Sequence, residues 1–159
     1  MTNPMIKHPT LRSTRAAADR VCESTLPHVL ILGGGFGGLW ATRGLARAPV
    51  RITLIDRTNH HLFQPLLYQV ATAGLGADDI SYAARGIFRR QHNVTFRMAR
   101  VTSVDVDART VLLGAGSPLH YVTLVVPAGA VRHSYGVAGG DEHAFPLIAV
   151  VDAVSFPHP

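Results

Sequence analysis

A glycine-rich turn and an acidic residue are the first features of this sequence that could carry chemistry. Gly33, Gly35 and Gly38 have the spacing GxGxxG, and Asp56 follows 56 − 38 = 18 residues after the last of them. In this pattern the first glycine permits a tight turn, the second lets a pyrophosphate approach the backbone, and the third lets a helix pack closely on a strand. An acid about 20 residues further on accepts hydrogen bonds from ribose hydroxyls and repels a 2′-phosphate. The spacing therefore predicts a dinucleotide site that takes an unphosphorylated adenosine.

The elements that would position these residues lie directly around them. His28–Leu32 is a short apolar run stopped by glycines, which is typical of a buried parallel strand. Residues 39–48 fit a helix that Pro49 ends, and Arg51–Asp56 fits a second strand. The 56 − 28 + 1 = 29 residues from His28 to Asp56 are enough for a βαβ unit with a right-handed crossover. The helix start would offer free N–H groups and a positive dipole end to phosphates.

The rest of the chain predicts a small set of further elements. Residues 57–76 lack a clear period and are expected to form a long functional loop with a short helix. A helix is predicted from residue 78 to residue 90, with acids at its start, Arg89 and Arg90 at its end, and one apolar face made of Ile80, Ala83, Ala84, Ile87 and Phe88. Strands are predicted at 94–96, 101–106, 110–113 and 121–126. We expect the middle strands to form a small antiparallel excursion before the last strand rejoins the parallel sheet.

The predicted fold class is therefore α/β, with a Rossmann-like domain around a central parallel sheet. The domain is expected over residues 27–136. Residues 1–26 are rich in Arg, Ser and Thr and lack the apolar stretch of a secretory signal, so a disordered leader is expected, with an organelle presequence as the alternative. Residues 137–159 lose periodicity and are expected to form an irregular tail.

Composition excludes several other classes of function. The chain is 47% hydrophobic and 16% charged, as in globular proteins, and its net charge of +5 is spread over scattered arginines. Aromatic residues do not alternate with these arginines, so no nucleic-acid partner is expected. The single cysteine, Cys22, excludes an internal disulfide, a CxxC centre and a thiolate zinc site. The longest uncharged apolar run, residues 121–130, is too short to cross a bilayer.

The glycine turn and Asp56 do not by themselves distinguish FAD from NAD, but a longer motif adds a resemblance. Residues 59–74, NHHLFQPLLYQVATAG, resemble the segment that follows the first FAD-binding unit of type II NADH dehydrogenases, and the similarity runs from about residue 28 to about residue 113, less clearly to 135. The resemblance implies a Rossmann-like domain that binds FAD. The adenine of this FAD would contact the backbone of Val101. The cofactor-binding residues that it implies are Gly33, Gly35, Phe36, Gly37, Gly38, Asp56, Arg57, Gln64, Pro65, Gln69, Val101 and Gly129.

Several of these residues also have an ordinary structural reading. The apolar residues of the motif (Leu62, Phe63, Leu66, Leu67 and Tyr68) would be core in most proteins. His60 and His61 point apart if the segment is extended, so no metal site is expected. Trp40 is expected to pack rather than to stack on a flavin. No side chain stands out as a catalytic acid or base, which suits a protein that aligns a nicotinamide with a flavin.

The resemblance also implies partners and a location. The partners would be NADH and a quinone. The protein would lie in the cytoplasm, or peripherally at the cytoplasmic face of the membrane through a region outside this sequence. Complementation by another chain, or a homo-oligomer, would supply what is missing. Residues 126–130, Val-Pro-Ala-Gly-Ala, depart from the family's Ala-Thr-Gly-Ala, and Tyr121-Val122 stands where the family has Tyr-Asp. Pro127 would remove a donor from a central strand. These departures predict a truncated or frame-disrupted chain.

Three functions therefore remain open at this point. The first is a FAD-dependent NADH:quinone oxidoreductase, or a close variant with a donor such as sulfide that needs cysteines beyond Cys22. The second is a stand-alone or split adenine-dinucleotide module. The third is an inactive remnant.

Overall fold

The structure is a computed structural model, and it describes residues 25–127, 129, 133, 135–144 and 146–156. Residues 1–24, which include most of the expected leader, lie outside the described residues. The expected N-terminal βαβ unit is present as β1 (His28–Leu32), α2 (Phe36–Gly44) and β2 (Arg51–Asp56). The α/β, Rossmann-like prediction is thereby confirmed.

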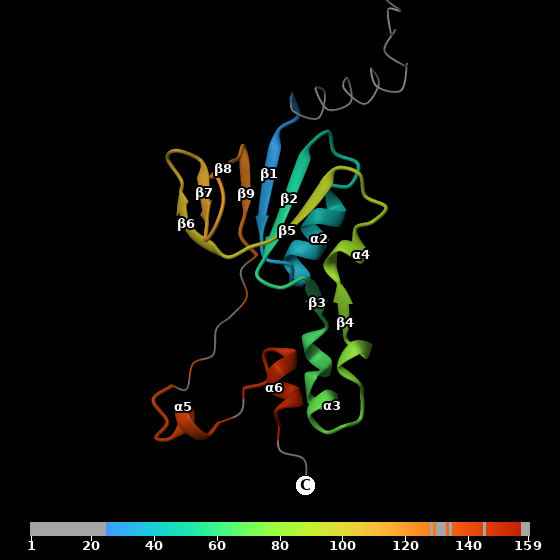
Figure 1. Cartoon of the computed structure of the whole chain (residues 1–159), viewed down its shortest axis with the longest axis vertical. Helices are drawn as coiled ribbons and strands as arrows, with labels where there is room; N and C mark the ends of the chain where they lie inside the picture. The colour runs from blue at the N-terminus through green and yellow to red at the C-terminus, as the bar shows by residue number, and fades with distance from the viewer. Residues whose placement is uncertain (1–24, 128, 130–132, 134, 145, 157–159) are drawn as a thin grey trace, which may run out of the picture.

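A four-stranded parallel sheet forms the centre of the molecule, with the order β5-β2-β1-β9 (Figure 1). β5 spans Val94–Met98 and β9 spans Thr123–Val125. Residues 29–31 of β1 pair in register with both β2 and β9. Four of the five residues of β1 are buried, which is the pattern of a parallel strand covered on both faces.

The two faces of this sheet are covered by different layers. Val29 and Ile31 point to one face and pack with Leu39 of α2 and with Phe88, which follows α4 (Ala84–Ile87). Because side chains alternate along a strand, Leu30 points to the opposite face. There it packs against a three-stranded antiparallel sheet, visible beside β9 in Figure 1, whose strands are β6 (Val101–Asp105), β7 (Thr110–Leu113) and β8 (Leu119–His120). The predicted antiparallel excursion is confirmed.

A second group of elements lies beyond the carboxyl ends of β1 and β2 (Figure 1). β3 (His60–Leu62) pairs antiparallel with β4 (Ser81–Ala83). The 3₁₀ turn η1 (Gln64–Leu66) leads into α3 (Leu67–Ala71), and a second such turn, η2 (Ala77–Asp79), precedes β4. The short helices α5 (Gly140–His143) and α6 (Val150–Val154) follow β9. Leu67, Val70 and Ala71 of α3 pack with Ile80 and with Ala153 of α6, forming a separate small core.

Of the helix predicted from residue 78 to residue 90, only residues 84–87 are α-helical. Ile80, Ala84 and Phe88 are buried as the spacing required, but residues 81–83 form β4. The backbone there pairs with β3, and Asp79 closes the η2 turn by accepting a hydrogen bond from the N–H of Gly76 at 2.9 Å. Tertiary strand pairing therefore overrides the local helical pattern, and only α4 remains helical.

Three further expectations need correction. The first helix spans Phe36–Gly44 rather than residues 39–48. At its C-terminal end, the side chains of Gln91 and Asn93 donate hydrogen bonds to the carbonyl oxygens of Thr42 and Leu45. Residues 137–159 are not irregular throughout, since they contain α5 and α6. The objection to Pro127 does not apply, because β9 ends at Val125 and is the edge strand of the described sheet.

Candidate functional site

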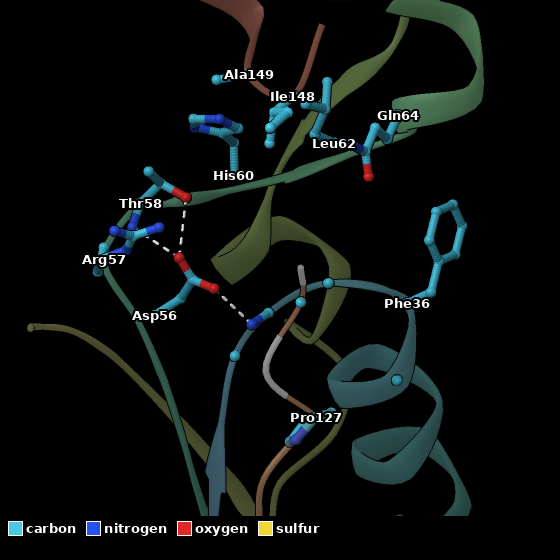
Figure 2. Close-up of a pocket in the computed structure, with 15 residues that line it drawn as sticks. Phe36, Asp56, Arg57, Thr58, His60, Leu62, Gln64, Pro127, Ile148 and Ala149 are labelled. Atoms are coloured by element: carbon cyan, nitrogen blue, oxygen red, sulfur yellow. Dashed lines mark hydrogen bonds between the residues drawn. The ribbon is translucent and has the colours of Figure 1, made fainter. Parts of the chain in front are cut away.

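A cavity of about 530 Å³ lies at the carboxyl ends of β1 and β2, where open α/β sheets bind their ligands (Figure 2). Its floor is the glycine turn between β1 and α2, and one side is formed by the residues that follow β2. Residues distant in sequence complete the wall. The lining residues are Gly33, Gly34, Gly35, Phe36, Gly37, Asp56, Arg57, Thr58, His60, Leu62, Gln64, Pro127, Gly129, Ile148 and Ala149.

The geometry of the turn glycines is compatible with the parts that their spacing predicts. Gly33 has φ +126°, a backbone conformation that residues other than glycine rarely adopt. A Cβ on Gly38 would stand 1.7 Å from the carbonyl oxygen of Gly33, so α2 and the turn can approach only because this residue is glycine. A Cβ on Gly35 would meet nothing within 4 Å, because this glycine faces the open cavity. The turn therefore offers exposed backbone to a ligand.

Asp56 ends β2 and lies against the glycine turn, as the dashed lines in Figure 2 show. Its Oδ2 accepts a hydrogen bond from the N–H of Gly34 at 2.5 Å. Its Oδ1 accepts from the N–H of Thr58 at 2.8 Å and from the hydroxyl of Thr58 at 3.0 Å. An ionised carboxylate has about four acceptor positions, so roughly one remains for a ribose hydroxyl without breaking a bond within the protein.

The N-terminus of α2 adds donors to the same cavity. The helix begins at Phe36 after the N-cap residue Gly35, and no side chain caps it. The first N–H groups of an α-helix have no partner within the helix, and the helix dipole makes this end attractive to anions. A pyrophosphate beside Gly35 and Gly37 would meet these groups directly.

Segments far from the glycine turn in sequence form the opposite wall. β3 and η1 contribute His60, Leu62 and Gln64, and Figure 2 shows Ile148 and Ala149 close to His60 and Leu62. The last two residues reach the cavity because α6, which follows them, packs on α3 through the fully buried Ala153. Pro127 lies under the turn, with its carbonyl oxygen 3.1 Å from the position that a Cβ on Gly33 would take.

The structure brings together most of the predicted cofactor-binding residues, but not all of them. Gly33, Gly35, Phe36, Gly37, Asp56, Arg57, Gln64 and Gly129 line the cavity, whereas Gly38 is buried beneath it. The remaining three lie elsewhere. Val101 is in β6, Pro65 is in η1, and Gln69 is in α3, where its side chain donates to the hydroxyl of Tyr68 at 3.0 Å.

Other residues of the site were not predicted from the sequence. Gly34 and Thr58, which bond Asp56, are an unconstrained position of the GxGxxG motif and an ordinary loop residue. Ile148 and Ala149 carry no local signal at all.

Trp40, expected to pack, is 64% exposed and lies under the guanidinium of Arg43 at 5.9 Å from the ring centre.

The described residues contain no cluster of three or more His, Cys, Asp or Glu side chains that could hold a metal ion. None of the helices in the described ranges has both the length and the apolar character needed to cross a membrane.

Comparison with known proteins decides the family. Residues 27–158 match the family model described as pyridine nucleotide-disulphide oxidoreductase. The chain belongs to this family. Two type II NADH:quinone oxidoreductases of Mycobacterium tuberculosis are similar to it: NdhA is 48% identical over 111 residues (68% of this chain, 24% of NdhA), and Ndh is 43% identical over 129 residues (79% and 28%). The resemblance inferred from the sequence is confirmed, and the chain spans about a quarter of the length of these relatives.

Solved structures agree on the fold of the chain. NDH2 of Plasmodium falciparum in complex with NADH superposes with a TM-score of 0.74 at 20% identity, covering 82% of this chain and 28% of that protein. The sulfide:quinone oxidoreductase of Aquifex aeolicus superposes with a TM-score of 0.73 at 27% identity, covering 82% and 30%. Both matches place the same α/β architecture in the described part of the chain.

Proposed function

We propose that this chain forms the FAD-binding part of an oxidoreductase that passes electrons from NADH through FAD to a quinone. The observation that carries the proposal is the contact between Asp56 and the glycine turn at the carboxyl ends of β1 and β2, on which a dinucleotide can be held. The similarity to type II NADH:quinone oxidoreductases at 43–48% identity supports FAD as the cofactor and this reaction class.

The residues of the cavity fit the adenosine diphosphate half of FAD. Gly35 provides open backbone and the start of α2 provides donors for the pyrophosphate, while Asp56 retains an acceptor position for the ribose. The carboxylate would repel a 2′-phosphate, so the site should select unphosphorylated adenosine. Bound FAD would supply the two-electron chemistry. The protein's own part is to bind, orient and enclose it.

Titration of the purified chain with ADP and FAD, followed by calorimetry, tests this assignment. Both should bind, and ADP carrying a 2′-phosphate should bind more weakly than ADP. Asp56→Ala removes the ribose acceptor and the partner of the Gly34 N–H, so we expect ADP affinity to fall by about 10- to 100-fold. Asp56→Asn should narrow the difference between ADP and its 2′-phosphate, since the repelling charge is gone. A chain that binds neither ADP nor FAD contradicts the proposal.

We also propose that the 159-residue chain holds FAD weakly and oxidises NADH slowly or not at all. Phe36, which lines the cavity, is 40% exposed, and Phe63, which packs edge-on against it, is 41% exposed, so a flavin ring placed beside them would face solvent. Visible spectroscopy after gel filtration, followed by an NADH oxidation assay with a soluble quinone, measures both properties. A yellow protein with rapid turnover would show that these residues already enclose the ring.

A nucleotide-binding module completed by a second chain is the other candidate. Large aromatic side chains of α3 and β4 are exposed, Tyr68 at 55% and Tyr82 at 58%, and they would suit contact with another polypeptide. Light scattering of the purified chain, with and without FAD, distinguishes a monomer from a homo-oligomer. Gain of NADH oxidation on adding a separately expressed protein with its own GxGxxG turn would favour the split module.

The quinone acceptor suggests a location as well. We propose that the chain acts in the cytoplasm or peripherally at the cytoplasmic face of the membrane. A quinone with an apolar tail resides in the membrane, which favours the peripheral position. Fractionation of cells that express the tagged chain, with a high-salt wash of the membrane pellet, tests it. Recovery from outside the cytoplasmic compartment would contradict this location.

A further inference from the structure

His61 is a buried polar residue that the proposed chemistry does not use. It lies in the middle of β3 with only 7% of its surface exposed, and its Nδ1 is 3.0 Å from the carbonyl oxygen of Gly34. A carbonyl oxygen can only accept a hydrogen bond, so Nδ1 must carry the proton and donate. His61 therefore ties β3 directly to the glycine turn.

Gly34 is consequently held on both sides by side chains. Its N–H donates to Asp56 at the end of β2, and its carbonyl oxygen accepts from His61 on β3. The N–H belongs to the peptide group shared with Gly33, and the carbonyl belongs to the peptide group shared with Gly35. Two consecutive peptide planes of the turn are therefore fixed from outside the turn.

The second of these planes matters for a ligand. In a trans peptide the N–H points opposite to the C=O, so the N–H of Gly35 points away from His61 once the Gly34 carbonyl is held. Gly35 lines the cavity and has open space beside it. Without the histidine the peptide group between Gly34 and Gly35 could rotate, because the backbone of glycine can adopt more conformations than that of any other residue.

The ring of His61 also positions the first residue of α2. Phe36 packs edge-on against His61, with ring centres 5.0 Å apart, and edge-on against Phe63 at 5.5 Å. Because Phe36 lines the cavity, β3 contacts the glycine turn through a hydrogen bond and through this aromatic pair. The two contributions can be separated by mutation.

We propose that His61 is a positioning residue that holds the Gly34–Gly35 peptide so that the Gly35 N–H faces the pyrophosphate of the bound dinucleotide. The inference rests on the proposed function, because it assumes that the cavity takes a dinucleotide. It assigns to β3 a part in phosphate binding that the GxGxxG spacing does not show.

Two variants separate the hydrogen bond from the ring packing. His61→Phe keeps an aromatic edge for Phe36 but has no donor, whereas His61→Asn keeps a donor at the position of Nδ1 but has no ring. We expect the Phe variant to bind ADP about tenfold more weakly, and the Asn variant to bind within about threefold of the wild-type chain. Calorimetry with ADP measures both.

His28→Phe is a matched control from the other end of β1. His28 is also 7% exposed, and its Nδ1 is also bonded to a backbone carbonyl, that of His120 at 2.7 Å. Because Nε2 of His28 is also bonded, to the hydroxyl of Thr53 at 2.8 Å, this variant should lower the melting temperature at least as much as His61→Phe and leave ADP affinity unchanged. The pair separates loss of stability from loss of positioning.

A spectroscopic readout accompanies the affinities. In the ¹H–¹⁵N spectrum the Gly35 amide should shift in His61→Phe, move back toward its wild-type position in His61→Asn, and stay in place in His28→Phe. Equal ADP affinity in the wild-type chain and His61→Phe, or equal losses in both His61 variants, would overturn the positioning role alone. A wild-type chain that binds neither ADP nor FAD would overturn the proposed function, and this inference with it.

Discussion

A buried histidine lies at each end of β1, but the hydrogen bonds at the two ends have different consequences. At the amino end, His28 is buried with both ring nitrogens bonded, to the carbonyl of His120 at 2.7 Å and to the hydroxyl of Thr53 at 2.8 Å. At the carboxyl end, His61 and Asp56 hold Gly34, while Gly35 and the helix start remain exposed. One end satisfies its polar groups internally, and the other uses buried groups to orient backbone that a ligand can reach.

The carboxyl end depends most on the close approach of two glycines. Gly38→Ala would place a Cβ 1.7 Å from the carbonyl oxygen of Gly33, so the turn and α2 must move apart. We expect a loss of about 3–5 kcal/mol in the free energy of unfolding, measured by urea denaturation.

Gly35→Ala is the control for that substitution. Gly35 has φ −68° and open space beside it, so stability should fall by only about 1 kcal/mol, whereas ADP affinity should fall because the methyl group enters the cavity. Equal destabilisation by the two substitutions would show that the close contact at Gly38 does not control the turn.

Thr53→Val tests the amino end of the comparison. It removes the hydroxyl that partners Nε2 of His28 and leaves that buried nitrogen without its partner. We expect a cost of about 1–2 kcal/mol in the free energy of unfolding, with ADP affinity unchanged. Altered affinity would mean that the two ends of β1 are coupled.

Acid should weaken the same end of the sheet. Burial, with a smaller contribution from the charge of Arg51, lowers the pKa of His28 below its usual value of 6.5, although the hydrogen bond to His120 opposes this. The unfolded chain then binds more protons than the folded chain below about pH 6.5, so stability should fall as the pH drops through this value. Denaturation midpoints from pH 8 to pH 5 measure this effect, and His28→Phe should flatten the profile.

Thr58→Val should have the smallest effect. It removes the hydroxyl bond to Asp56, but the N–H of residue 58 still donates to the same oxygen. ADP affinity should change by about threefold or less, because the carboxylate keeps two of its three partners. A loss of ADP affinity as large as that of Asp56→Ala would indicate that the hydroxyl of Thr58, rather than the backbone N–H groups, orients the carboxylate.

The sequence was sufficient for the parts of the fold that local patterns encode. A buried strand, a glycine turn and a second strand ending in Asp56 predicted the βαβ unit, and turn residues predicted the antiparallel strands. It failed at residues 81–83, where a helical spacing of apolar residues hides a strand that pairs with β3. Pairing between segments about 20 residues apart leaves no trace in a single periodicity.

The site shows the same limit. The glycines were predictable because each has a steric reason visible in the motif. The roles of Gly34 and His61 were not, because their contact joins a nominally free motif position to a residue 27 positions away. Ile148 reaches the cavity only through the packing of α6 on α3, which no local pattern announces.

The arrival of residues 148–149 at the cavity wall has a consequence for biosynthesis. The ribosome releases the glycine turn, Asp56 and β3 well before it releases α6, and β9 must pair with β1 in between. The nascent chain can therefore form the phosphate end of its pocket first, and the far wall of that end is completed only when α6 docks on α3.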